Sequence, residues 1–210
     1  MTSVGYSRWI VVAIVGLALA GAVHAGIVNN STISILNTSS TAFPSYDQIF
    51  ALDTAPNTDY ASQGFGAATH LDMDFGTAQT FQSIAYTDRV TSGGNNGGFV
   101  GGTFDFVTSF EYVFATDALF SNIVGSVTVS GLVAPVGATS AAQFLTTTSI
   151  PGITAEFVRW RVLTTNGVNP GASNFAFTVG ATATPEPGSL ALFGAGFAAL
   201  CLFRRRLRVS

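Results

Sequence analysis

The sequence predicts an all-β fold, either a sandwich or a jelly roll, and three observations on its middle part support this. Apolar and polar residues alternate there with a period of two. No stretch keeps the 3.6-residue apolar period of a helix. Clusters of Gly, Asn, Pro and Ser separate the alternating segments, notably at 91–102 and 165–172. Eight or so short strands in about 160 residues are typical of these two architectures.

Each alternating segment predicts one strand. Val158, Trp160 and Val162, for example, fall on one face of their segment. A short helix is a further candidate at 139–149. The candidate strands are 31–36, 69–75, 80–87, 104–107, 110–114, 123–130, 156–163 and 173–181.

The first 25 residues have the pattern of a secretory signal peptide. Arg8 precedes an apolar stretch at 9–23, and Val-His-Ala at 23–25 supplies the small-residue cleavage site. We expect a signal helix here, with cleavage after Ala25. A retained membrane anchor is the alternative.

The C-terminal residues 181–210 have the pattern of a short linker followed by a second targeting segment. After Pro185-Glu186-Pro187 come 14 apolar or small residues at 190–203, which as a helix would span roughly 21 Å of the ~30 Å hydrocarbon core. Such a helix makes only a marginal membrane span. The positive charges that follow would stay cytoplasmic and leave the body outside. They are Arg204, Arg205, Arg206 and Arg208.

These three parts in this order resemble the PEP-CTERM sorting signal. The resemblance implies processing by an exosortase in a Gram-negative bacterium that makes an exopolysaccharide matrix. It also implies a hydrophobic sorting helix that holds the chain in the membrane before processing. An ordinary tail-anchored helix is the alternative.

Between these ends, 26–180 fits one domain. It contains eight Asp, two Glu, three Arg and no Lys, a net charge of −7, which disfavours binding to nucleic acid. The only cysteine, Cys201, lies in the tail, so the domain has no disulfide. Fifteen of the 18 Phe lie in the domain and are enough for an apolar core.

Several segments of this domain, taken in chain order, form a recognisable set of motifs. They are 51–62 (Ala-Leu-Asp-Thr-Ala-Pro-Asn-Thr-Asp-Tyr-Ala-Ser), 71–76 (Leu-Asp-Met-Asp-Phe-Gly), 110–117, 154–159 and 171–177. Together they resemble the discoidin-like family, the galactose-binding jelly rolls also called coagulation-factor C-type domains, over about 130 residues. The resemblance implies an eight-stranded antiparallel jelly-roll sandwich whose loops at one end bind a ligand, commonly a sugar.

The same resemblance implies a calcium site made of Asp53, Thr58 and Asn174. This chain departs from the family where Thr54 replaces a turn Gly, Tyr60 replaces a Trp and Asn174 replaces a Glu. An Asn carbonyl is an acceptable neutral ligand, but the missing charge should lower calcium affinity. An Asx turn at Asp53, which needs no ion, is the alternative, and both interpretations stay open.

Candidate ligand-binding residues surround the glycine-rich run 91–102. Asp88 and Arg89 precede it and offer hydrogen bonds, while Phe99 within it could stack on a sugar ring or fold back onto the core. Sugar recognition uses this mixture of a flat apolar face and a few polar groups. The run lacks the Lys-Ser/Thr ending of a phosphate-binding loop.

No catalytic set is evident. His70 is the only His of the domain, and neither a nucleophile elbow nor zinc-ligand spacing occurs. Asp72 and Asp74 share a strand face, whereas glycoside hydrolysis needs carboxylates that flank the scissile bond. We expect Asp72 in solvent and Asp74 in a strand-end hydrogen bond. Arg159 and Arg161 should form ion pairs with sheet neighbours.

We therefore expect an exported protein of the cell surface or extracellular matrix that acts as a non-catalytic carbohydrate-binding module. A structural biofilm or matrix protein without a specific ligand is the alternative. A glycoside hydrolase comes third.

Overall fold

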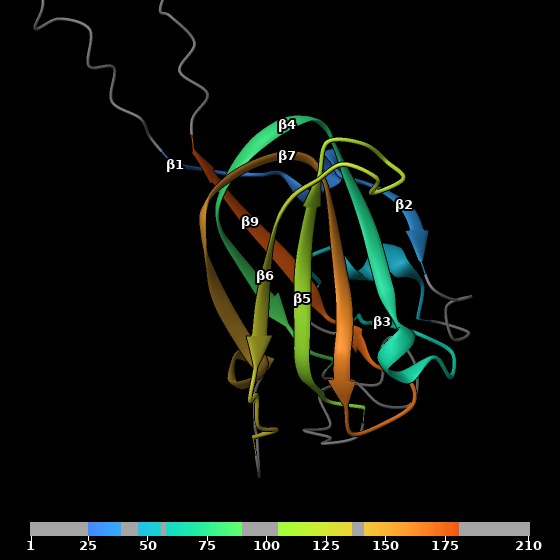
Figure 1. Cartoon of the computed structure of the whole chain (residues 1–210). Helices are drawn as coiled ribbons and strands as arrows, with labels where there is room; N and C mark the ends of the chain where they lie inside the picture. The colour runs from blue at the N-terminus through green and yellow to red at the C-terminus, as the bar shows by residue number, and fades with distance from the viewer. Residues whose placement is uncertain (1–24, 39–45, 56–57, 90–104, 136–140, 181–210) are drawn as a thin grey trace, which may run out of the picture. The chain divides into compact units, whose positions relative to one another are not determined.

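The computed structural model of the chain describes residues 25–38, 46–55, 58–89, 105–135 and 141–180 (Figure 1). Nine strands and four short 3-10 helices make up these ranges, which contain no α-helix. None of the helical segments in the described ranges has the length and apolar character that a membrane span requires. The elements are β1 (Ala25–Ile27), η1 (Asn30–Thr32), β2 (Ser34–Thr38), η2 (Gln48–Ala51), β3 (Tyr60–Ala61), η3 (Gly66–Ala68), β4 (His70–Thr87), β5 (Val107–Ala115), β6 (Ile123–Ser130), η4 (Ala141–Phe144), β7 (Leu145–Thr165), β8 (Gly171–Ala172) and β9 (Asn174–Gly180).

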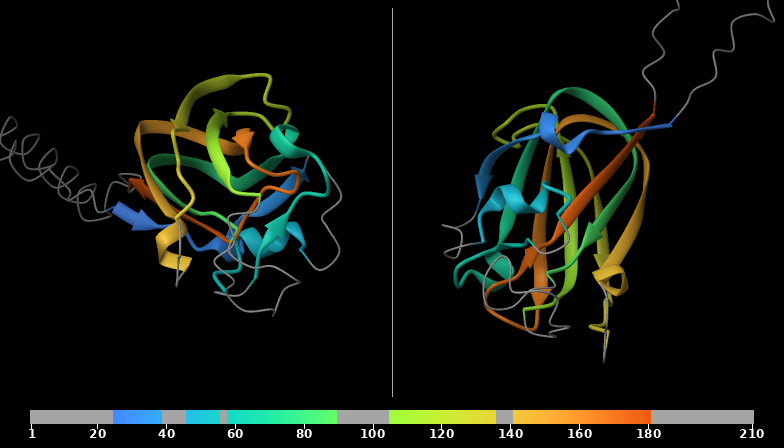
Figure 2. Two further views of the ribbon diagram at one scale, coloured as in Figure 1. Left: turned by 90° about the horizontal axis from the view of Figure 1, so that it is seen from below. Right: turned by 180° about the vertical axis from the view of Figure 1, so that it is seen from behind.

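Two long strands, β4 and β7, build the sandwich because each runs through both of its layers. The first half of β4 pairs with β2 and with the second half of β7, which continues to β5 and β6. The second half of β4 pairs with β9 and with the first half of β7, and β1 extends this layer beyond β9. All these pairs are antiparallel. Figure 1 shows β4 and β7 arching over one end of the molecule, and Figure 2 shows both layers from two further sides.

The arch of β4 and β7 is made by local irregularities in both strands. The β4–β7 register shifts between Asp74 and Gln79. Gly76 in β4 and Gly152 in β7 have φ values of 69° and 70°, a backbone conformation that residues other than glycine rarely adopt. The Asp74 carboxylate accepts a 2.7 Å hydrogen bond from the Gly76 N–H, so the predicted hydrogen bond is present, although Asp74 lies inside β4 and not at a strand end.

Aromatic side chains fill the space between the layers. Trp160, Tyr86 and Phe110 are completely buried and lie within 6.4 Å of one another, measured between ring centroids. Phe175 from β9 packs against both Tyr86 and Trp160. The core therefore joins strands of both layers through ring contacts, each of which adds about 0.5–1.5 kcal/mol to ordinary apolar burial.

The predicted all-β jelly-roll architecture is confirmed, with differences in detail. The segments 69–75 and 80–87 form one continuous strand, and the strand predicted at 104–107 is wrong because Asp105 occupies a turn with φ 64°. The short helix expected within 139–149 is the 3-10 turn η4. The predicted signal helix and sorting helix lie outside the described residues. The one exception is Ala25, the last residue of the predicted signal peptide, which belongs to β1 and pairs with Gly180 of β9.

Candidate functional site

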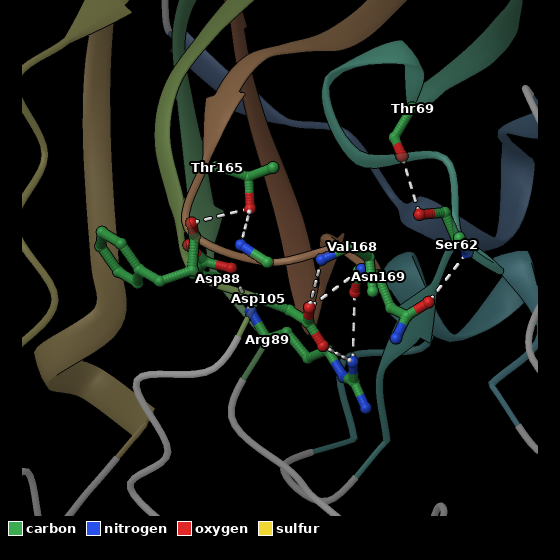
Figure 3. Close-up of polar contacts among 11 residues, drawn as sticks. Ser62, Thr69, Asp88, Arg89, Asp105, Thr165, Val168 and Asn169 are labelled. Carbon is green, nitrogen blue, oxygen red and sulfur yellow. Dashed lines mark hydrogen bonds and ion pairs between the residues drawn. The ribbon is translucent and has the colours of Figure 1, made fainter.

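One end of the sandwich, which we call the loop end, brings together residues 88–89, 105–106 and 165–170. Residues 88–89 follow β4, 105–106 precede β5, and 165–170 lead from β7 towards β8. Figure 3 shows the polar contacts that join them. The sequence predicted two residues of a ligand site here, Asp88 and Arg89.

Arg89 is held in one orientation by contacts on several sides. Its Nη1 donates 3.1 Å hydrogen bonds to an Asp105 carboxylate oxygen and to the Asn169 carbonyl. The guanidinium carbon lies 4.6 Å from the centre of the Tyr46 ring, within the range of a cation–π contact. The side chain is only 13% exposed. Nη1 is used by these internal bonds and Nε is buried, so the guanidinium is a planar cation held in one orientation.

Asp105 is the centre of this arrangement. Besides the Arg89 pair, its carboxylate accepts hydrogen bonds from the backbone N–H groups of Val168 and Asn169, at 2.8 and 2.9 Å. The two segments approach so closely that a Cβ on Gly167 would lie 2.6 Å from the Asp105 Cα. Only glycine therefore fits at position 167. The Asp105 carboxylate holds both Arg89 and the loop that carries Val168 and Asn169.

Asp88 belongs to the loop end but is only 1% exposed. Its two carboxylate oxygens accept hydrogen bonds from the N–H groups of Arg89 (2.7 Å) and Val107 (2.8 Å). Burial raises the pKa of Asp88 to about 7, although these two N–H donors oppose the rise. Asp88 therefore ties the end of β4 to the start of β5, and its contact with a ligand stays a prediction.

A second loop is tied to the same end. The Asn169 side-chain oxygen accepts a 2.8 Å hydrogen bond from the Gly64 N–H, and the Ser62 N–H donates to the Pro170 carbonyl at 3.0 Å. Thr69 donates to the buried Ser62 hydroxyl at 2.7 Å. These bonds, partly visible in Figure 3, place the 62–69 segment beside the loop that carries Asn169.

The residues predicted to hold calcium belong to two segments that meet. The Thr58 hydroxyl lies 2.8 Å from both carboxylate oxygens of Asp53 and 3.1 Å from the Ala55 carbonyl. The Thr58 carbonyl accepts a 3.2 Å hydrogen bond from Ser173, the residue before Asn174. Asp53 also accepts from the Ala55 N–H at 2.9 Å, the bond of an Asx turn. In the described ranges, no three His, Cys, Asp or Glu side chains gather in a way that could hold a metal.

Away from the loop end, charged side chains line the outer face of one layer. Arg159 makes a two-pronged pair with Asp72 at 2.6 and 2.7 Å, and Arg161 pairs with Glu111. The expected ion pairs are thus present. The expectation that Asp72 faces solvent is wrong: it is 2% exposed, because Arg159 covers it from the neighbouring strand.

Two residues that contact Arg89 were not predicted from the sequence. Asp105 belonged to a segment predicted as a strand, and Tyr46 precedes the first discoidin-like motif. The φ of 64° at Asp105 is a backbone state in which Asp and Asn are enriched, so an Asp within a turn-rich stretch was the available signal. Phe99, the third predicted ligand residue, lies outside the described residues.

The sorting tail is matched by a known family model. Residues 183–206 match the PEP-CTERM protein-sorting motif, which confirms the predicted resemblance and indicates an exported, cell-surface protein. The match covers the predicted Pro185, Glu186, Pro187, Arg204, Arg205 and Arg206. No curated protein matches the chain in sequence.

The sandwich is similar to solved carbohydrate-binding modules. A family 32 module of NanJ from Clostridium perfringens, solved with galactose, has 16% identity and a TM-score of 0.55, with 74% of this chain and 99% of that chain covered. Module CBM32-3 of a family 31 glycoside hydrolase from the same species has 19% identity and a TM-score of 0.54, covering 73% and 94%. A fucose-binding module of Streptococcus pneumoniae has 10% identity and a TM-score of 0.52, covering 71% and 96%. These neighbours share the discoidin-like jelly roll.

Proposed function

We propose that this chain is an exported surface protein whose sandwich is a non-catalytic carbohydrate-binding module, with the loop end as its binding site. The tail directs it to an exosortase, and its ligand is a polysaccharide of the cell wall or matrix of a Gram-negative bacterium. The fold of the neighbours and the sorting motif support this proposal.

The observation that carries the binding site is the fixed guanidinium of Arg89. Sugar hydroxyls are recognised by a few polar groups held in place, and Asp105 and the Asn169 carbonyl hold this one. Little side-chain freedom is then lost on binding. The predicted partner Phe99 would add an apolar face from the glycine-rich run.

A glycan array with the full chain in detergent micelles, calcium present, tests the proposal. We expect binding to neutral glycans that Arg89→Gln lowers by about tenfold or more, since the variant removes a charged donor. Arg161→Gln, which removes the same charge from the outer face, is the matched control and should leave neutral-glycan binding unchanged. Absence of binding to every glycan contradicts the proposal.

Calcium is part of the proposal. Asp53, Thr58 and Asn174 would hold the ion with the Ala55 and Thr58 carbonyls, and hard oxygen donors of this kind suit calcium. The ion would fix the turn after η2 against the start of β9. We expect calcium to raise the melting temperature of the full chain and a chelator to reverse the rise. Asp53→Asn should abolish the response, whereas Asp117→Asn, in an exposed turn, should retain it. A melting temperature that calcium leaves unchanged favours the ion-free Asx turn.

A structural matrix role is the second candidate, and one feature favours it. No charged residue occurs from 118 to 155, a stretch that includes the edge strand β6. Ile123 and Val124 of that strand are 57% and 44% exposed. Sheet edges without charges are prone to pair with other strands. We expect concentration-dependent assembly of the chain that Ser126→Lys abolishes, as measured by sedimentation. Monomeric behaviour at all concentrations removes this candidate.

A further inference from the structure

A cavity lies on the outer face that carries the Arg159–Asp72 and Arg161–Glu111 pairs, and it has no part in the proposed function. Its volume is about 330 Å³, and we call it the arginine groove. This volume falls in the range of about 300–1,000 Å³ that is common for small-molecule sites. Its lining is formed mainly by Ala67, Ala68, His70, Arg159, Arg161 and Leu163.

Basic side chains gather at this groove although the domain is acidic. Residues 26–180 contain three Arg, one His and no Lys, against ten acidic residues. Two of the three Arg and the single His line the groove. Because Asp72 and Glu111 each pair with one arginine, the groove would attract an anion through guanidinium N–H groups that these pairs leave unused and not through excess positive charge.

Both arginines are oriented by partners and still keep donors. Arg159 uses Nε and Nη2 for Asp72, and Arg161 uses the same two nitrogens for Glu111. In the part of the chain that the structure describes, neither Nη1 makes a hydrogen bond, and each carries two N–H groups. The Arg159 guanidinium also rests 4.3 Å from the centre of the Phe120 ring. A ligand would therefore find these donors already positioned.

Exposure differs between the two arginines in a way that suits binding. The Arg161 side chain is 50% exposed, whereas Arg159 is 29% exposed above the buried Asp72. Arg161 is thus the more accessible of the two arginines to a ligand, and Arg159 provides a more buried edge. The uncharged part of the lining consists of Ala67, Ala68, Thr69, Val162 and Leu163, which offer a small apolar area beside the arginines for the C–H face of a sugar ring.

We propose that the arginine groove binds the carboxylate of an acidic sugar residue, such as a uronic acid within a polysaccharide. Guanidinium groups recognise carboxylates through parallel N–H···O bonds. The choice of a saccharide as the carrier of the carboxylate rests on the proposed function. This site is separate from the loop end and would let one domain contact an acidic chain at two places.

Calorimetric titration of the full chain in detergent micelles tests this site. The probes are galacturonic acid oligosaccharides and neutral galactose oligosaccharides of the same length. We expect Arg161→Gln to weaken galacturonate binding about tenfold or more while leaving neutral binding unchanged. Ala67→Phe, which fills the groove without changing any charge, should have the same effect. Arg208→Gln is the matched control: it removes an equal charge in the sorting tail, outside both proposed sites, and should leave galacturonate binding unchanged.

The outcomes separate this proposal from the previous one. Neutral binding without galacturonate binding overturns the groove and leaves the loop end intact. Equal weakening by Arg208→Gln and Arg161→Gln also overturns the groove, because only overall charge would then matter. Loss of binding to both probes overturns both proposals. Circular dichroism of each variant checks that the sandwich is folded.

Discussion

The space between the layers and the loop end are both closely packed, but different interactions hold them. Between the layers, aromatic rings such as Tyr86, Trp160 and Phe175 meet with little polar chemistry. At the loop end, Asp88 and Asp105 accept backbone N–H groups from separate segments. Side-chain volume should therefore set the stability of the interior, whereas charge and protonation should govern the loop end.

The largest expected effect lies in the interior. Trp160→Ala should lower the free energy of unfolding by about 3–5 kcal/mol, because it leaves a cavity among fully buried rings. Trp160→Phe should cost clearly less, since the Trp160 Nε1 has no hydrogen-bond partner among the described residues. Urea unfolding measures both values. Equal losses for the two variants would show that ring volume does not control this region.

A pH dependence should mark the loop end. Burial raises the pKa of Asp88 to about 7 in the folded chain, against about 3.9 when unfolded. The folded state therefore holds this proton more tightly, and stability falls as the pH rises from about 4 to about 7, by on the order of a few kcal/mol. We expect a higher melting temperature at about pH 5 than at about pH 8. Asp88→Asn should flatten the profile, and a wild-type profile that is already flat contradicts the prediction.

A smaller loss should follow from the Arg89 partner. Asp105→Asn keeps a residue type that tolerates the positive φ but removes the charge, so we expect a loss of about 1–3 kcal/mol. Glu111→Gln removes the partner of the half-exposed Arg161 and should cost less than about 1 kcal/mol. Chemical denaturation compares them. If Glu111→Gln lowers the free energy of unfolding more than Asp105→Asn does, the Arg161–Glu111 pair is the more important one and the prediction is wrong.

The smallest effect should be a gain. Thr54 has φ 59°, a left-handed conformation that strains a β-branched residue, and the related family has Gly here. Thr54→Gly should stabilise the chain by up to about 1 kcal/mol, after allowance for the greater freedom of Gly in the unfolded state. Thr77→Gly, at an exposed position without positive φ, should destabilise it slightly. Thermal unfolding under identical conditions measures both.

The sequence allowed prediction of features that depend on local pattern. Alternation around Trp160 identified a strand, and the motif at 51–62 placed a tight turn where Thr54 now shows a positive φ. The ion pairs of Arg159 and Arg161 could be expected from their shared face. Each of these follows from residues close together in the chain.

Features that depend on contacts between residues far apart in the sequence could not be predicted. Asp105 contacts Val168 and Asn169, more than 60 residues away, so no local pattern signals the contact. The burial of Asp72 likewise depends on Arg159 from another strand. The two-residue strands β3 and β8 are too short for periodicity to reveal them.

The pairing of β9 with β4 also fixes at which end of the sandwich β9 ends. Gly180 lies opposite Thr80 and Asn174 opposite Thr87, so the exit of the chain and Asp88 are at opposite ends of one strand segment, roughly 20–25 Å apart. Ala25 lies beside Gly180, so both chain ends leave from one corner. Arg89, which follows Asp88, therefore lies at the end of the sandwich opposite both Ala25 and Gly180.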